Sequence, residues 1–123
     1  MYTPKYFSAQ EFKRCTPSCS IEDMDEEFLR KIDEVREKAG IPMYMLSAYR
    51  SPQWEVGKGR SGKGDHPQGC GVDFRCLTGA ERYKILRAAF EVGFRRIGIA
   101  KTYIHLGTGE NLPQDVVWHY YGD

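Results

Sequence analysis

The sequence predicts an α+β fold in which two main helices pack on a small, mainly antiparallel sheet. Two segments repeat apolar residues at helical spacing, and each of them ends at a glycine. Short apolar runs bounded by turn residues follow both segments, which is typical of strands. Two of these runs lie close enough along the chain to form a hairpin, which favours antiparallel pairing. A length of 123 residues leads us to expect a single domain, 1–123.

The helices are predicted from their ends. Residues 8–11, Ser-Ala-Gln-Glu, form a capping box and predict a short helical turn. Helical spacing of apolar residues over 25–39 predicts the first main helix, which Gly40 ends. A second capping box at 78–81, Thr-Gly-Ala-Glu, opens the other main helix, and Gly93 lies where a C-terminal capping glycine belongs.

The strands are predicted from short segments that are rich in apolar and aromatic residues. These segments are 43–49, 71–76, 97–99, 103–106 and 116–121. Only three residues separate the third segment from the fourth, so we expect this pair to be the hairpin. Glycines and a proline punctuate 107–115, which we expect to be a loop.

Composition and charge narrow the possible partners. A formal net charge of +1 gives no reason to expect a nucleic-acid or anionic-membrane partner. No apolar stretch approaches the ~18 residues of a membrane-spanning helix, so we expect no membrane insertion. The first six residues lack a hydrophobic signal segment, and we therefore expect synthesis in the cytoplasm. We also expect a monomer.

The four cysteines leave several possibilities open. They are Cys15, Cys19, Cys70 and Cys76. Three disulfide pairings are possible, and the sequence does not choose among them. A structural zinc held by four thiolates is another possibility, although the spacings differ from the C-x2-C pairs typical of such sites. Reduced, partly buried thiols fit a chain without a secretion signal.

A glycine-rich stretch, Gly57–Phe74, allows two interpretations. Its first half resembles the phosphate-binding loop G-x-x-x-x-G-K-[ST], but Gly64 stands where that loop needs a hydroxyl. No apolar strand precedes it, and the proline and glycines that follow, Pro67, Gly69 and Gly71, would break the required helix. We therefore interpret the basic residues of the first half as a solvated surface loop.

The second half of the stretch contains candidate metal ligands. His66 and Asp73 flank a glycine-rich turn that leads into a predicted strand, so both side chains can face one point. His105 lies within a predicted strand, where alternation places it on the face opposite Ile104 and Leu106. Zinc in catalytic sites takes three protein ligands and leaves one position for water.

Three motifs in order resemble the zinc D-Ala-D-Ala carboxypeptidases and peptidoglycan endopeptidases. That family shows S-x-Y-R-S/T, then S-x-H-x-x-G-x-A-x-D, then a strand with an apolar-apolar-H-apolar centre. The matching segments here are "SAYRS" at 47–51, "HPQGCGVD" at 66–73 and "YIHL" at 103–106. The resemblance covers most of the chain and is strongest to short, single-domain phage and prophage members. It implies a hedgehog/DD-peptidase-like fold.

The resemblance also implies roles for individual residues. His66, Asp73 and His105 match the family's ligands to one zinc ion. Arg50 matches an arginine that contacts a substrate carboxylate or the developing oxyanion, for which its planar fork is suited. Two aromatic residues near these motifs, Tyr49 and Trp54, are candidates for stacking on the substrate, although Tyr49 could equally be a core residue. The implied substrate is a peptidoglycan stem peptide.

The chain departs from the family pattern at the catalytic carboxylate. Many relatives carry Glu or Asp three residues before the last histidine, where this chain has Thr102. Phage-type relatives carry aspartate two residues after it, where this chain has Gly107. His119 is our candidate for a substitute base, because a neutral histidine can accept a proton and its charged form can stabilise an anion. Glu110 and Asp115 are further candidates.

Two functional hypotheses follow, beside a third in which the chain is a small α+β domain without a metal and the motif match is coincidental. The first is a zinc metallopeptidase that acts on the cell wall after phage-type release or as part of a virion. The second is a domain of the same fold that keeps zinc for structure or recognition and no longer catalyses a reaction. The missing carboxylates at positions 102 and 107 favour the second hypothesis.

Overall fold

The computed structural model describes residues 1–120 and confirms the predicted α+β class. Five strands form one sheet in the order β1-β2-β4-β3-β5. The strands are β1 (Met45–Ser47), β2 (Gly71–Arg75), β3 (Arg96–Ile99), β4 (Tyr103–Gly107) and β5 (Val116–His119). Three of the four neighbouring pairs are antiparallel, and β3 with β5 is the parallel pair. The predicted hairpin is the β3–β4 pair.

The helices begin and end close to where their caps predict. They are α1 (Ala9–Arg14), α2 (Glu26–Ala39), α3 (Pro52–Gly57) and α4 (Gly79–Val92), with short 3₁₀ turns η1 (Ile21–Asp23) and η2 (His66–Gln68). The hydroxyls of Ser8 and Thr78 cap α1 and α4 in complete capping boxes. Gly40 and Gly93 end α2 and α4 in the left-handed conformation that a glycine adopts without strain.

One helix is absent from the sequence expectations. No helix is expected from the sequence over residues 52–57, but they form α3. The Ser51 hydroxyl accepts a hydrogen bond from the Trp54 amide, and Pro52 occupies the first turn, where its missing N–H costs nothing. The predicted last strand also ends earlier, at His119, and its final predicted residue, Tyr121, lies outside the described residues.

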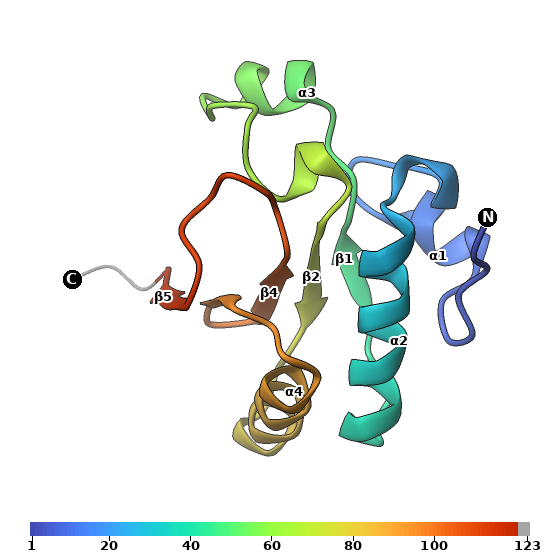
Figure 1. Cartoon of the computed structure of the whole chain (residues 1–123), viewed down its shortest axis with the longest axis vertical. Helices are drawn as coiled ribbons and strands as arrows, with labels where there is room; N and C mark the ends of the chain where they lie inside the picture. The colour runs from blue at the N-terminus through green and yellow to red at the C-terminus, as the bar shows by residue number, and fades with distance from the viewer. Residues whose placement is uncertain (121–123) are drawn as a thin grey trace.

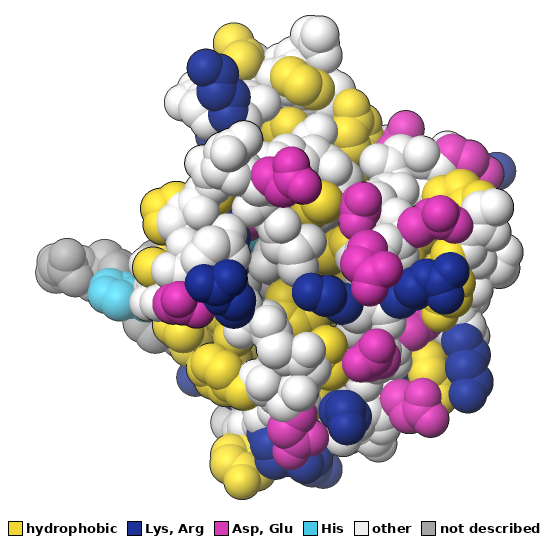
Figure 2. All heavy atoms as spheres, viewed as in Figure 1, with side chains coloured by type: hydrophobic (Ala, Val, Ile, Leu, Met, Phe, Trp, Pro, Cys, Tyr) yellow, Lys and Arg dark blue, Asp and Glu magenta, His cyan; other side chains and the backbone are white. Residues whose placement is uncertain are grey.

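The sheet separates an apolar layer from a polar one. α2 and α4 lie next to each other and cover one face, as Figure 1 shows. Core side chains of the sheet and helices meet there, among them Phe28, Leu29, Ile32, Val72, Phe74, Ile85, Ile97, Ile104 and Leu106. On the face of the molecule seen in Figure 2, acidic and basic side chains intermingle over α2. No helix within residues 1–120 is long and apolar enough to cross a bilayer.

Candidate metal centre

The second face of the sheet carries a row of residues in register across all five strands. The row consists of Ser47, Asp73, His105, Gly98 and Trp118. Because side chains alternate along a strand, this row points away from the helical layer. His105 therefore faces away from its neighbours Ile104 and Leu106, which are fully buried in the core, as the sequence predicts.

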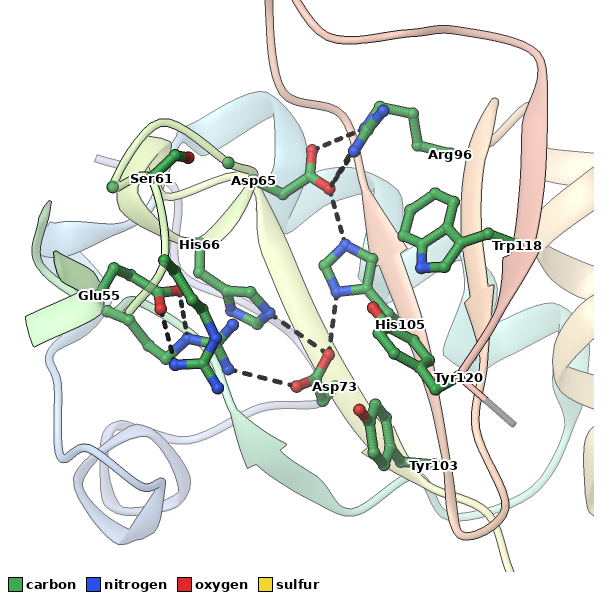
Figure 3. A pocket seen from close by; sticks show the side chains of 14 residues that line it. Glu55, Ser61, Asp65, His66, Asp73, Arg96, Tyr103, His105, Trp118 and Tyr120 are labelled. Atoms are coloured by element: carbon green, nitrogen blue, oxygen red, sulfur yellow. Dashed lines mark hydrogen bonds and ion pairs between the residues drawn. The ribbon is translucent and has the colours of Figure 1, made fainter. Parts of the chain in front are cut away.

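His66, Asp73 and His105 come together at one point (Figure 3). Their nearest ligand atoms all lie within 4.8 Å of one another. An oxygen of Asp73, Oδ1, is 3.3 Å from Nε2 of His66 and 2.9 Å from Nδ1 of His105. Within residues 1–120 this is the one group of three or more His, Cys, Asp or Glu side chains with such geometry. Three elements supply it, since η2 carries His66, β2 carries Asp73 and β4 carries His105.

Each histidine has a partner for its other ring nitrogen. Nδ1 of His66 lies 2.5 Å from the carbonyl oxygen of Ala48, and Nε2 of His105 lies 2.7 Å from Oδ2 of Asp65. Oxygen acceptors at these positions can hold the protons on those nitrogens, so that Nε2 of His66 and Nδ1 of His105 would be free to present lone pairs to a metal ion bound between them and Asp73. Two imidazole nitrogens and one carboxylate form a donor set that zinc prefers. The residues present therefore fit a metal ion.

The electrostatics of the group also favour a cation. Burial alone would raise the pKa of Asp73, but hydrogen bonds from His105 and His66 hold it well below the usual range. Burial would lower the pKa of His105, yet its hydrogen bonds to Asp65 and Asp73 raise it. Two ionised carboxylates thus lie beside one buried imidazole, and together they stabilise positive charge at this point.

The three side chains lie in a pocket with two different sides (Figure 3). We call the first the arginine side, formed by Arg50, Glu55 and Arg60, and the second the aromatic side, formed by Tyr103, Trp118 and Tyr120. The loop after α3 also lines the pocket through Ser61, Gly62 and Gly64. This loop was expected only to be a solvated surface segment.

The arginine side is held together by Glu55, whose side chain is only 4% exposed. Its Oε1 lies 2.7 Å from Nε of Arg50, and its Oε2 lies 2.9 Å from Nη1 of Arg60. Arg50 also donates to Oγ of Ser47 at 3.2 Å and reaches Asp73 at 3.5 Å. Arg50, predicted from the sequence, therefore lies beside the candidate ligands, and Glu55 is a component of the site that sequence reasoning missed.

The aromatic side depends on a glycine. A β-carbon at Gly98 would lie 2.7 Å from Nε1 of Trp118 and 2.8 Å from a ring carbon of Tyr120, closer than real side chains approach. The absence of a side chain at this position lets both rings lie over the sheet, and the Trp118 ring packs 5.5 Å from that of His105.

We expect Gly98→Ala to displace Trp118 and to lower the free energy of unfolding by about 1–3 kcal/mol, the typical cost of overpacking. Urea unfolding and tryptophan emission would measure the two effects. A matched substitution is Gly57→Ala on α3, because a β-carbon there meets no atom within 4 Å. Equal stability losses in the two variants would contradict this account of Gly98.

The other sequence-predicted residues lie outside the pocket lining. Tyr49 is half-buried against the hydrophobic core, which matches its alternative interpretation as a core residue. Trp54 lies against the arginine side, with the guanidinium groups of Arg50 and Arg60 at 5.8 and 5.7 Å from its ring centre. His119 is exposed on β5 and, by strand alternation, faces away from Trp118. The structure therefore does not bring His119 to the candidate ligands.

The two substitute carboxylates considered from the sequence also lie elsewhere. Asp115 is paired with Arg95 on the surface at 2.6 Å. The backbone amide of Glu110 donates to the Gln68 side chain, away from the pocket. None of residues 108–115 lines the pocket. The acids that do line the pocket are Glu55, Asp65 and Asp73, and each is engaged by arginine or histidine.

The four cysteines are free and buried. They do not gather into a four-thiolate zinc site, since the group of candidate ligands within residues 1–120 is His66, Asp73 and His105.

Comparison with known proteins places the chain in a family. The model of the peptidase M15 family matches residues 5–107, which include all three candidate ligands and Arg50. Neither the search of curated proteins nor the search of solved structures found a match. A family match over most of the chain agrees with the motif resemblance and with the geometry of the site. The chain belongs to the peptidase M15 family.

Proposed function

We propose that this protein is a zinc-dependent peptidase that hydrolyses amide bonds in peptidoglycan stem peptides. The observation that carries the proposal is the group of His66, Asp73 and His105 in an open pocket, with the second nitrogen of each histidine held by an oxygen acceptor. The family match supports the peptidase activity. The motif resemblance to peptidoglycan-cleaving enzymes supports the choice of substrate and of a single zinc ion.

Each side of the pocket has a task in this proposal. A zinc ion held by the three ligands would polarise the scissile carbonyl and lower the pKa of a coordinated water to about 7. Glu55 and Ser47 hold Nε and Nη1 of Arg50, so Nη2 is the nitrogen that would meet a substrate carboxylate or acyl oxygen. The aromatic side offers flat apolar surface against which a peptide can pack and exclude water.

A second candidate function is a zinc-binding domain of the same fold without catalysis. It is favoured by the partners that the pocket carboxylates already have, since Glu55, Asp65 and Asp73 all lie in ion pairs or hydrogen bonds with arginine or histidine. General acid-base help is typically worth about 10²–10⁴-fold, so an enzyme without a dedicated base would be slow but measurable.

One experiment separates the two functions. Purified sacculi and a synthetic stem pentapeptide would be incubated with the protein, and the products identified by mass spectrometry. We expect release of D-amino acids or shortened stems, loss of the products with a chelator, and recovery on adding zinc. Zinc binding without any product would support the second function and contradict the first.

The setting of the activity is part of the same proposal. We propose that the protein reaches the cell wall by phage-type release or as a virion component, and that it acts as a monomer. Size-exclusion chromatography with light scattering tests the monomer, because a dimer would have twice the 14.2 kDa expected from the sequence.

A further inference from the structure

Asp65, the residue just before His66, is buried at the inner end of the pocket. Its carboxylate accepts a hydrogen bond from Nε2 of His105 at 2.7 Å and one from the amide of Gly109 at 2.8 Å. Arg96 on β3 contacts both carboxylate oxygens, with distances of 3.0–3.2 Å. The buried carboxylate is thus held by an ion pair with Arg96 and by two further hydrogen-bond donors.

Three glycines make room for this carboxylate. A β-carbon at Gly71 would lie 2.8 Å from the β-carbon of Asp65, and one at Gly109 would lie 2.6 Å from Oδ1. A β-carbon at Gly107 would overlap the carboxylate itself. Gly107 lies on the same face of β4 as His105, two residues further along the strand. The carboxylate of Asp65 therefore occupies the space that a side chain at position 107 would fill.

Arg96 is itself fixed, so the carboxylate has little freedom to move. Its Nη1 donates to the carbonyl oxygen of Pro113 at 2.6 Å, and its guanidinium lies 5.1 Å from the ring centre of Trp118. Asp65, Arg96 and His105 are all at least 91% buried. Figure 3 shows Asp65 between Arg96 and His105, on the side of the imidazole opposite Asp73.

We propose that Asp65 is a positioning residue for the metal centre. Its carboxylate, at the start of the η2 turn, takes the place that an acidic side chain at position 107 on β4 would fill. The proposal rests on the zinc binding of the proposed function. By accepting from Nε2 of His105, Asp65 fixes the ring orientation and the tautomer whose Nδ1 faces Asp73 and the metal. The ion pair with Arg96 keeps that acceptor charged and in place.

The test moves the carboxylate from one position to the other. The variants are Asp65→Ala, Asp65→Asn, Gly107→Asp and the double variant Asp65→Ala/Gly107→Asp, with Asp115→Ala as the control for an exposed aspartate–arginine pair. Zinc dissociation constants would be measured by chelator competition on the full chain. Thermal unfolding would show which variants fold.

We expect Asp65→Ala to weaken zinc binding about 10–100-fold, the usual cost of losing an outer partner of a metal ligand. Gly107→Asp alone should also weaken binding, because its side chain overlaps Asp65. The double variant should recover about tenfold relative to Asp65→Ala, a coupling typical of residues in contact. Asp115→Ala should bind zinc as the wild type does. Asp65→Asn keeps the shape and covers the case in which Asp65→Ala fails to fold, and it should also bind zinc more weakly.

A second readout reports the tautomer directly. Long-range ¹H–¹⁵N correlation spectra of the zinc-loaded wild type should show a protonated, hydrogen-bonded Nε2 on His105. This proton signal should shift or disappear in the Asp65 variants and return in the double variant, which a merely structural role would not produce.

The possible failures are distinguishable. Folded Asp65→Ala and Asp65→Asn variants that bind zinc as tightly as the wild type, with an unchanged Nε2 signal, would overturn this inference alone. A folded double variant that gains nothing over Asp65→Ala would overturn the exchange of positions. A wild type that binds no zinc would overturn the proposed function as well.

Discussion

Replacing His105 by alanine is expected to remove the metal and nearly all peptidase activity. His105 supplies one of three candidate ligand atoms, and its ring is 4% exposed between Asp65 and Asp73. Losing a direct ligand should exceed the roughly 10–100-fold loss in affinity that an outer partner costs. The metal's transition-state stabilisation is worth several kcal/mol, so activity should fall by about 10³-fold or more. Native mass spectrometry and product release from sacculi measure the two effects.

His119→Ala is the matched control for this variant. It removes the same side chain from the neighbouring region of the sheet, but from an exposed position outside the pocket lining. We expect its zinc content and activity to match those of the wild type. An inactive His119→Ala with normal zinc content would restore His119 as the catalytic base predicted from the sequence. A fully metal-loaded and active His105→Ala would contradict the whole site.

Much of the fold could be predicted because its signals are local. The capping boxes at Ser8 and Thr78 and the glycines at 40 and 93 fix helix ends through contacts within a few residues. The hairpin of β3 and β4 follows from a short connection. The α3 helix was missed because the glycines that follow it suggested a loop, while its own signals, Ser51 as cap and Pro52 in the first turn, span only two residues.

The candidate ligands could be predicted because three motifs match the family pattern, and strand alternation placed His105 on the face opposite Ile104 and Leu106. Asp73 and His105 lie opposite each other on the adjacent strands β2 and β4. A sequence pattern can place each residue on a face of its strand, but it cannot show that the two strands pair. The pairing depends on strand order, and that order is set by contacts between residues far apart in the chain. For the same reason, Tyr49 could not be assigned to the core or to the pocket, and His119 could not be assigned to either face of its strand.

The departures from the family motif held information that sequence reasoning did not use. Gly107 was interpreted as a missing carboxylate, and the acidic residue at position 65 was not considered. The structure shows that the two positions share one space, since the Asp65 carboxylate lies where a side chain at 107 would be. Gly107 stands where the family pattern has an acidic residue, and Asp65 is an additional acidic residue next to the ligand His66. These two departures together are the signal that could have identified Asp65 as part of the site.

Removing the Glu55 carboxylate is expected to lower the stability of the fold strongly, because it breaks a largely buried ion pair of the pocket. Glu55 is 4% exposed and bridges Arg50, which is 14% exposed, and Arg60. Breaking a buried pair from one side typically costs about 3–5 kcal/mol, because the remaining charge stays buried without its partner. Glu55→Ala should lower the free energy of unfolding by about 3 kcal/mol, measured by urea unfolding. The control Glu91→Ala breaks an exposed pair with Arg87 and should cost about 0.3–0.5 kcal/mol.

The milder variant Glu55→Gln separates a role in positioning Arg50 from a general loss of structure. Glutamine keeps the shape and one acceptor, but it loses the charge that holds Nε of Arg50. Zinc affinity should change little, because Arg50 reaches Asp73 only at 3.5 Å and the histidines keep their own acceptors. Peptidase activity should nevertheless fall by up to about 10²-fold, since a displacement of about 1 Å in a group that orients substrate can cost that much. Equal losses of zinc affinity and activity would instead show that Glu55 supports the metal centre as a whole.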